Sequence, residues 1–546
     1  MRDPKNGKRF KEISDGILDT IWRSCPVAAT LYGIHEYDHT IGDVSADAFR
    51  EYALTFRNYA EALLAEVDVS QMDKDEEIDY HMAVSFALSN NISLELQRPW
   101  MNDPSLYASL CIWGCYSLIT RESTPLDDRM RSILSRLREI PDVLQIAQSN
   151  ITNPSLVHSQ VALEVTQGGS GFFRYMIPEA AALTPSLQAD VLKANEAAIS
   201  AFENYERWLL ETVIPNADGD FAVGHEVYEQ LISVEHLLEY SPSDLVTLGE
   251  KVLADAQKEI QKIARTIDPN VTWQELVCLL KQDHPDKHSL LEAYRDEIQR
   301  AKTFVMERGL VAITAGEKLD VRETPQFERS TIPYAAYFPP APFGGDRIGH
   351  FWVTPVDDQA TQEDQESQLL GHCRYTIPII ALHEGYPGHH LQLTRSLDLK
   401  SRLRKQAMNS LLIEGWALYC EELMYEEGFY TDPRVRLFQL KDLIWRACRV
   451  IIDVGLHTGE MTFDEAVRML VNTAHLEEIN AVAEVKRYAM SPTQPMTYII
   501  GKMIISDLRD QLKQKLGNRF CLKEFHNQLL SYGSIPPSLI ALSMLD

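Results

Sequence analysis

Three histidines and a glutamate stand within eight residues, from His383 to His390, and they follow an apolar run at residues 377–382. Histidine is the commonest neutral metal ligand, and a glutamate beside a metal can act as the base for a water molecule. The segment is a divergent form of the zinc-binding pattern H-E-x-x-H, because Pro387 stands four residues after His383. These residue types predict a metal centre with Glu384 as its general base.

The spacing of the histidines requires a break in the helix that carries them. In a continuous helix, His389 would lie roughly 9 Å along the axis from His383 and on nearly the opposite face, and His390 would lie roughly 10 Å away. Proline removes a backbone donor and disfavours helical torsions at the residue before it, while glycine permits unusual torsions. We therefore expect an interruption at Pro387–Gly388 that returns a second histidine to the metal.

On these grounds either His389 or His390 can be that second ligand. Removing Pro387–Gly388 on paper converts the motif to H-E-x-x-H-H, and this analogy assigns His389 to the metal. His390 would then face the cleft beside the metal and take part in catalysis by hydrogen bonding to the substrate. The reverse roles of the two histidines stay open. A structural alternative also exists, since a histidine pair beside a proline can simply cap a helix.

A third ligand is expected from a second helix, which begins near Leu411, lacks proline and ends near Gly428. Glu414 is flanked there by apolar residues, and a buried carboxylate needs a partner. Glu421 lies two turns further on the same face, where it could accept a hydrogen bond from a ligand imidazole as a second-shell group. Two histidines with Glu414 leave one zinc position open, as in catalytic sites. The alternative for Glu414 is an ion pair with arginine.

Residues 383–392 and 414–421 resemble the two signature blocks of the DUF885 family. Residues 26–38, 224–228 and 487–502 are similar to the outer blocks of the same family, although Thr493 replaces its usual glycine. The resemblance covers most of the chain. It implies a mostly helical, zinc-dependent peptidase-like protein with a fold like that of the helical, cleft-containing zinc carboxypeptidases and oligopeptidases, and it leaves the substrate open.

The C-terminal block offers groups that could act on or bind a substrate. Tyr498 and Lys502 are four residues apart on an expected helix and share a face, and Arg487 and Tyr488 precede a turn at Pro492. A tyrosine hydroxyl can donate to a developing oxyanion, and arginine or lysine can hold a carboxylate. The resemblance favours roles for Arg487 and Tyr498 over a solvated surface position. We expect Tyr498 to be catalytic and Arg487, Tyr488 and Lys502 to bind substrate.

The elements that must position these groups are mainly helices. Apolar residues recur at helical spacing over residues 185–212, 244–263 and 290–306. Residues 319–356 instead contain several prolines and glycines around short extended pieces at 334–338 and 350–354, which predicts a small β element just before the metal-binding helix. An exposed strand edge there could bind an extended peptide, and a packing loop is the alternative.

The expected fold class is mostly α, with an N-terminal helical subdomain at residues 1–318 and a metal-binding catalytic subdomain at residues 319–546, packed around one cleft. A net charge of −27 over 546 residues argues against nucleic acid and against anionic membrane surfaces as partners. The chain has no apolar run of about 18 residues and no secretory signal pattern. Its eight scattered cysteines fit a reducing compartment, so we expect a cytoplasmic protein.

The combined expectation is a zinc-dependent hydrolase, with one Zn²⁺ per chain, that cleaves amide bonds in peptides or peptide-like small molecules. One alternative is a metal-dependent biosynthetic enzyme that uses the same site for cyclisation or group transfer on an amino-acid-derived small molecule. Another is a non-catalytic binding protein with a vestigial site, although the intact His383–Glu384 pair and Glu414 argue against it. The sequence does not indicate an oligomeric state.

Overall fold

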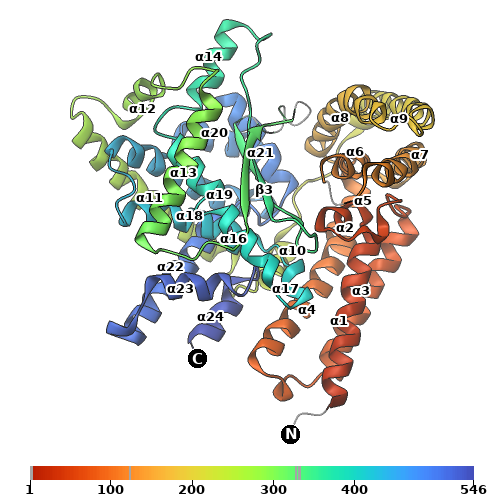
Figure 1. Cartoon of the computed structure of the whole chain (residues 1–546), viewed down its shortest axis with the longest axis horizontal. Helices are drawn as coiled ribbons and strands as arrows, with labels where there is room; N and C mark the ends of the chain where they lie inside the picture. Colours follow the sequence, from red (N-terminus) through yellow and green to blue (C-terminus); the bar gives the residue numbers. More distant parts are fainter. Residues whose placement is uncertain (1–3, 122–123, 326–328, 330–331, 333, 546) are drawn as a thin grey trace. The chain divides into compact units, whose positions relative to one another are not determined.

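The computed structural model describes residues 4–121, 124–325, 329, 332 and 334–545, which form many helices and one small sheet (Figure 1). The mostly α fold class is therefore confirmed. Internal contacts divide the chain into two compact units, Met1–Glu235 with Ala341–Asp346 and His236–Pro340 with Arg347–Asp546. The sequence placed a division after residue 318, whereas the contacts group residues 236–318 with the second unit.

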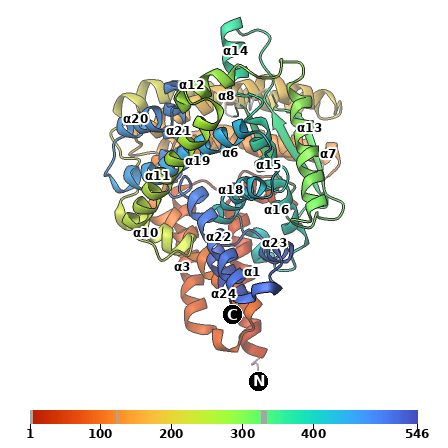
Figure 2. The ribbon, with the colours of Figure 1, turned by 90° about the vertical axis from the view of Figure 1, so that its left-hand side faces the viewer.

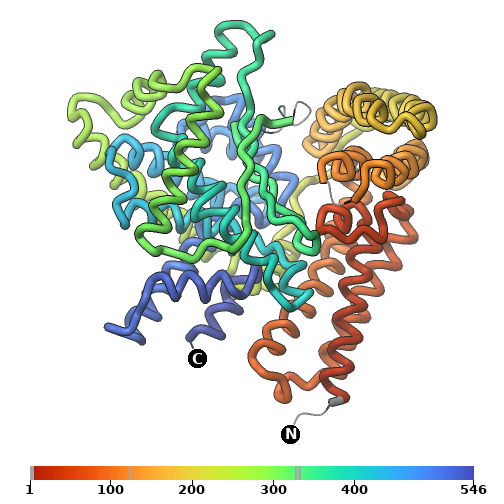
Figure 3. The backbone as a smooth tube through the Cα atoms, in the orientation of Figure 1, coloured from red at the N-terminus to blue at the C-terminus, as the bar shows by residue number. Residues whose placement is uncertain are grey.

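The first unit is built from helices joined by short 3₁₀ and π turns. Helices α6 to α9 pack against one another, and α3 packs against α1 and α4. The red, orange and yellow helices of Figure 3 trace this part of the chain. The helices of the unit are α1 (Pro4–Ser24), α2 (Pro26–Tyr32), α3 (Ala46–Glu66), α4 (Lys74–Ile92), α5 (Pro99–Asn102), α6 (Ser105–Thr120), α7 (Leu126–Asn150), α8 (Leu156–Ala182), α9 (Gln188–Trp208) and α10 (His225–Gln230).

The second unit carries every residue that the sequence predicts for the site. Its main packing pairs are α11 with α19, α18 with α22, and α13 with α15, and several of these helices can be followed in Figure 2. The helices are α11 (Pro242–Ile267), α12 (Trp273–Lys281), α13 (Leu290–Arg308), α14 (Gln362–Leu370), α15 (Ile377–Glu384), α16 (His389–Arg395), α17 (Arg402–Gln406), α18 (Ser410–Glu426), α19 (Pro433–Thr458), α20 (Phe463–Thr473), α21 (Glu478–Met490), α22 (Thr497–Leu516), α23 (Leu522–Leu530) and α24 (Pro537–Leu545).

The three helices predicted from apolar periodicity are present as α9, α11 and α13. Helix α11 begins with a capping box, in which the Ser241 side chain accepts from the Asp244 amide and the Asp244 side chain accepts from the Ser241 amide. Helix α13 ends at Gly309, whose φ of 62° lies in the left-handed region that glycine adopts without steric cost. Local signals in the sequence thus located these helices correctly.

The small β element is a three-stranded sheet of β1 (Lys318–Glu323), β2 (Ala335–Phe338) and β3 (Ile348–Val353). The strand order is β1-β3-β2, with β1 parallel and β2 antiparallel to β3, so β1 and β2 form the two edges. Phe351 and Val353 of β3 are buried, and the ring of Trp352 stacks on that of Phe338. Both extended pieces predicted from the sequence are strands, as expected.

Helices α18 and α22 approach each other closely because a glycine stands on each at the crossing. A Cβ atom on Gly501 would lie 1.9 Å from the carbonyl oxygen of Leu411, and one on Gly415 would lie 2.5 Å from the backbone of Gly501. Only glycine at both positions permits this separation. The crossing brings the α18 residue Glu414, next to Gly415, close to the α22 residue Tyr498.

None of the described helices is both long and apolar enough to cross a membrane. All eight cysteines lie in the described part of the chain, and none of them forms a disulfide bond.

Candidate metal centre

The helix that carries His383 and Glu384 ends where the sequence predicts an interruption. Helix α15 stops at Glu384, and α16 starts at His389. In between, the Tyr386–Pro387 peptide is cis, and the Gly388 amide donates to the Leu382 carbonyl at 3.0 Å. A Cβ atom on Gly388 would lie 1.9 Å from the His383 carbonyl oxygen, so this turn requires glycine.

The turn is attached to the neighbouring helix by one specific contact. The indole Nε1 of Trp416, on α18, donates a hydrogen bond to the Pro387 carbonyl at 2.8 Å. Trp416 is fully buried, and a buried indole N–H needs such an acceptor. This bond sets the position of the interrupted segment relative to the helix that carries Glu414 and Glu421.

The interruption brings His389 back beside His383. Their ring centroids are 4.7 Å apart, with the ring planes at 89°. One ligand atom from each of His383, Glu384 and His389 lies within 4.8 Å of the others. The Nε2 atoms of His383 and His389 lie 3.8 and 3.3 Å from the same oxygen of Glu414, Oε2. The structure therefore assembles the three predicted metal ligands with Glu384 beside them.

These separations match what a zinc ion requires of its ligands. With metal–ligand bonds of about 2.0–2.2 Å, two ligands of a tetrahedral site lie about 3.4 Å apart. Among the described residues, no group makes a well-oriented hydrogen bond to Glu414 Oε2 or to His389 Nδ1, although both atoms are buried. A buried carboxylate oxygen without a donor is costly. The donor set of two imidazoles and one carboxylate therefore fits a divalent cation.

Glu421 accepts a hydrogen bond from the candidate ligand His383, as its spacing from Glu414 predicted. Its side chain is 1% exposed, and it accepts a hydrogen bond from His383 Nδ1 at 2.8 Å, which leaves Nε2 directed at Glu414. Arg446 of α19 lies 3.6 Å from the same carboxylate oxygen of Glu421. The carboxylate thus sets both the tautomer and the orientation of the His383 ring.

The electrostatics of this cluster call for positive charge. Burial of His383 lowers its pKa, but the nearby carboxylates of Glu414 and Glu421 outweigh burial and raise the pKa to about 9. Burial of Glu414 raises its pKa, but His389 and His383 outweigh that effect and hold the pKa well below its usual value. Both shifts have the same origin, since two buried carboxylates must be compensated either by protonated imidazoles or by a cation.

His390 has a different environment from the one expected. It is fully buried, its Nε2 donates to the Glu317 carboxylate, and its Nδ1 accepts from the Tyr337 hydroxyl at 3.0 Å. Glu317 also accepts from Tyr386 at 2.6 Å and from Lys302 at 2.7 Å. Both ring nitrogens of His390 are therefore engaged inside the protein. The expectation that His390 is free to bind substrate beside the metal is wrong.

Glu317 is the centre of this second cluster. It is 2% exposed at its side chain. Burial raises its pKa, but the hydrogen bonds from His390, Lys302 and Tyr386 outweigh burial and lower the pKa to about 2. The cluster links the end of α13, the loop before β1 and the start of α16, so it holds the segment that carries His389. No feature of the sequence around Glu317 indicated this role.

Tyr498 lies beside the candidate metal ligand His383. Its ring is nearly parallel to that of His383, with 6.5 Å between the centroids. The guanidinium carbons of Arg449 and Arg446 lie 4.7 and 5.8 Å from the centroid of the Tyr498 ring. Burial and the Glu414 carboxylate raise the pKa of Tyr498, and the arginines oppose this increase. Its hydroxyl is therefore a proton donor at neutral pH.

The three predicted substrate-binding residues have different surroundings. Arg487 is 41% exposed at its side chain, pairs with Glu484 at 2.9 Å and donates to Gln494 at 3.2 Å. Lys502 lies 3.6 Å from Glu422, a carboxylate that it shares with Arg436. Tyr488 is fully buried, and its oxygen accepts hydrogen bonds from two α19 side chains. The prediction that Tyr488 contacts substrate is therefore wrong, and its place is in the core beneath Arg487.

Sequence reasoning missed Arg446 and Arg449. They stand three residues apart in the otherwise apolar run at 443–452 of α19. Arginines in such a run must find acceptors when they are buried, so the pattern was an available signal. In the structure they lie beside Tyr498 and connect it to Glu421 and Glu484.

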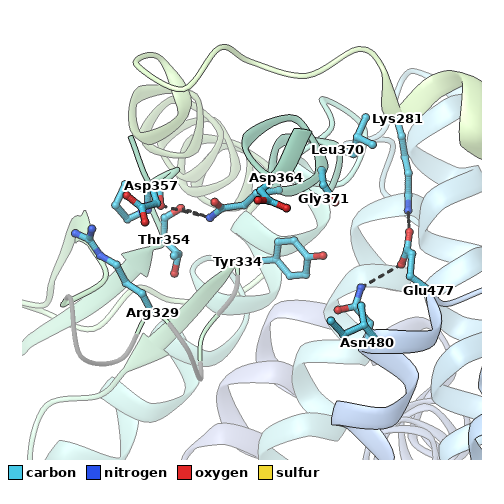
Figure 4. A pocket seen from close by; sticks show the side chains of 14 residues that line it. Lys281, Arg329, Tyr334, Thr354, Asp357, Asp364, Leu370, Gly371, Glu477 and Asn480 are labelled. Carbon is cyan, nitrogen blue, oxygen red and sulfur yellow. Dashed lines mark hydrogen bonds and ion pairs between the residues drawn. The ribbon is translucent and has the colours of Figure 1, made fainter. Parts of the chain in front are cut away.

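A polar cavity of about 770 Å³ lies elsewhere in the same unit (Figure 4). Lys281 pairs with Glu477 at one side of it, and Tyr334 points into it between this pair and Thr354. None of the candidate metal ligands lines this cavity. We therefore locate the candidate metal centre by the side-chain atoms of His383, His389 and Glu414 that lie close together, and not by the size of a cavity.

A comparison with curated proteins found no match. Two solved structures are similar over nearly the whole chain. One is described as a candidate lipoprotein of unknown function from Shewanella oneidensis. It is 26% identical, with 98% of this chain and 100% of that chain covered and a TM-score of 0.81. The other is described as a candidate lipoprotein from Colwellia psychrerythraea. It is 20% identical, with 98% of each chain covered and a TM-score of 0.82, and it supports the fold alone.

The family model that matches this chain is described as bacterial protein of unknown function, DUF885. The match runs from residue 26 to residue 544, so it includes the histidine block, the Glu414 block and the outer blocks recognised in the sequence. Because the match covers nearly the whole chain, the chain belongs to the DUF885 family.

Proposed function

We propose that this protein is a zinc-dependent hydrolase that cleaves amide bonds of peptides or peptide-like small molecules. The observation that carries the proposal is the convergence of His383 Nε2 and His389 Nε2 on one buried oxygen of Glu414, with Glu384 beside them. His383, His389 and Glu414 would hold the zinc ion. When bound, zinc supplies a water of lowered pKa and polarises the carbonyl group of the scissile amide.

The remaining steps belong to side chains of this chain. Glu384 follows His383 directly and is partly exposed, so it can take the proton of the attacking water and deliver it to the leaving amine. Tyr498 would donate its hydroxyl proton in a hydrogen bond to the carbonyl oxygen as negative charge develops there. Glu421 would keep the His383 ring in the orientation that presents Nε2.

The cytoplasmic location and the small-molecule or peptide partner stay predictions. Free cysteines fit a reducing, cytoplasmic location, whereas the two similar structures are described as candidate lipoproteins. The negative charge favours a small-molecule or peptide partner over nucleic acid.

The proposal is tested in two stages. Elemental analysis of the purified chain should find about one zinc per chain, and His383→Ala should lose it while keeping its helical circular dichroism. An untargeted screen of peptides and metabolites should then show amine and carboxylate products appearing together. Full zinc occupancy in His383→Ala would refute the ligand assignment. Products of ring closure or group transfer would replace hydrolysis by the biosynthetic alternative.

Glu384→Gln separates metal binding from chemistry. Glu384 is not one of the three assigned ligands, so the variant should retain zinc. Loss of a general base typically lowers turnover by about 10²- to 10⁴-fold. The variant should show this loss in kcat on any substrate found in the screen. Near-native turnover with full zinc content would refute the assigned role of Glu384.

A further inference from the structure

Three arginines lie close enough to Tyr498 to lower its pKa. Arg446 and Arg449 come from α19, and Arg487 comes from α21. Arg449 and Arg487 share one carboxylate oxygen, Glu484 Oε2, at 3.1 and 2.9 Å. Arg449 also lies 4.7 Å from the centroid of the Tyr498 ring, and that ring is stacked against His383. Arg449 is thus connected to the candidate metal centre through Tyr498, and Arg446 is connected to it through Glu421, which accepts a hydrogen bond from His383.

The charge of this group is not balanced. Arg446 has two acidic neighbours of its own, Glu421 at 3.6 Å and Asp442 at 3.9 Å. Arg449 and Arg487, in contrast, have the one carboxylate of Glu484 between them. Two guanidinium groups around a single carboxylate leave one positive charge in excess. Burial raises the pKa of Glu484, but the two arginines outweigh burial and lower it to about 2, so the carboxylate is ionised.

The excess charge can be reached from solvent at one end. The side chain of Arg449 is 6% exposed, and it rests on the Trp445 ring, 4.3 Å from its centroid. Arg487 is the exposed member of the pair. A ligand that reaches Arg487 therefore meets a guanidinium positioned by Glu484 and Gln494, and the desolvated guanidinium of Arg449 shares Glu484 Oε2 with it. Such paired donors are suited to a planar anion.

We propose that Arg449 and Arg487 form a subsite for a carboxylate of the substrate, beside Tyr498. The substrate class would then be peptides or peptide-like molecules with a free carboxylate near the scissile amide. A single excess positive charge favours a monoanion such as a carboxylate over a dianionic phosphate. An extended peptide advances about 3.5 Å per residue, so the carboxylate would belong to a residue close to the cleaved bond. This inference rests on the proposed hydrolase function for its catalytic meaning.

The test compares peptides that differ in one group. A series of fluorescently N-acylated di- to pentapeptides is made as matched pairs, with a free C-terminal carboxylate or a C-terminal amide. Binding is measured by fluorescence anisotropy on the full-length, zinc-loaded Glu384→Gln variant, which binds without turnover. We expect the acid to bind about 10- to 100-fold more tightly than the amide for at least one length, as expected for a charge-assisted bidentate contact.

A second variant assigns the effect to the subsite. Arg487→Gln, made in the Glu384→Gln background, should reduce the acid-to-amide affinity ratio to nearly one. The control is Arg434→Gln in the same background. Arg434 is 42% exposed, against 41% for Arg487, and pairs with Asp432 at 2.7 Å, but it makes no described contact with the candidate metal centre or Tyr498. The control should keep the ratio of the parent protein.

The outcomes separate the subsite from the hydrolase proposal. Equal affinity for acid and amide, or no binding of either form, would overturn the carboxylate subsite, even if wild-type protein hydrolyses peptides. A high ratio that Arg487→Gln abolishes would support the subsite, even if wild-type protein hydrolyses none of the peptides. In that last case the amide-hydrolase proposal fails and the anion subsite stands. A ratio that Arg434→Gln lowers as much as Arg487→Gln would also overturn the assignment.

Discussion

Glu421 should control the zinc affinity of the chain without touching the metal. It accepts a hydrogen bond from His383 Nδ1 at 2.8 Å, is almost completely buried and lies 3.6 Å from Arg446. Loss of a group that orients a metal-binding histidine typically weakens metal binding by about 10- to 100-fold, which corresponds to about 1.4–2.7 kcal/mol. Glu421→Gln keeps an acceptor oxygen, so we expect roughly the tenfold end of this range. Glu421→Ala removes the acceptor and should approach roughly 100-fold.

The neighbouring residue provides the matched control. Glu422 lies on α18, as Glu421 does, and it accepts two hydrogen bonds from Arg436 of α19, at 2.8 and 3.0 Å. It makes no described contact with the three assigned ligands. Glu422→Gln should therefore lower the free energy of unfolding while leaving zinc affinity unchanged.

The assay titrates zinc into the chelator-treated protein in competition with a chromophoric chelator of known affinity. Circular dichroism of each variant before titration shows that the fold is retained. If both Glu421 variants bind zinc within twofold of the wild type, Glu421 does not orient a metal ligand. Equal weakening by Glu422→Gln would show instead that zinc affinity simply follows overall stability.

Three further predictions concern stability. Chelation of zinc should lower the free energy of unfolding by about 2.7 kcal/mol relative to protein in free zinc at 100 times its Kd, and an unchanged melting temperature would contradict this. The pKa of Glu317 is about 2 in the fold and about 4.3 when unfolded. Ionised Glu317 therefore contributes to the free energy of unfolding above about pH 5. This contribution is lost as the pH falls toward 2, at about 1.4 kcal/mol per pH unit. Urea unfolding of Glu317→Gln should show a shallower acid decline, and an unaltered slope would refute this. Gly501→Ala should cost about 1–3 kcal/mol through overpacking. Gly168→Ala, inside α8 with open space around it, should be neutral or stabilising in the same denaturant series.

The sequence was sufficient for the parts of the fold that depend on short-range chemistry. Proline at 387 and glycine at 388 predicted the end of α15, because each acts on the torsions and hydrogen bonds of its own turn. The Pro/Gly-rich run at 319–356 predicted a small β element and two of its three strands, β2 and β3, for the same reason. Apolar periodicity located α9, α11 and α13.

The sequence also pointed to candidate ligands that lie together in the structure. Glu414 and Glu421 are seven residues apart on one face of α18, and both reach His383, as the helical spacing required. The analogy that aligned His389 with the ligand position agrees with its place beside Glu414. The assignment of zinc itself stays a prediction.

Only the tertiary structure decided which partners the polar side chains of His390 and Tyr488 contact. His390 and His389 are adjacent in sequence, yet His390 is turned to Glu317, 73 residues away, because that carboxylate and the Tyr337 hydroxyl satisfy both of its nitrogens. Tyr488 is buried because two α19 side chains donate to it. Partners so distant in sequence leave no periodic or local trace, since their contact depends on how whole helices pack. Sequence by itself therefore determined the ligand types and the helix break that permits them to meet, and packing determined which of the remaining groups stay available for a substrate.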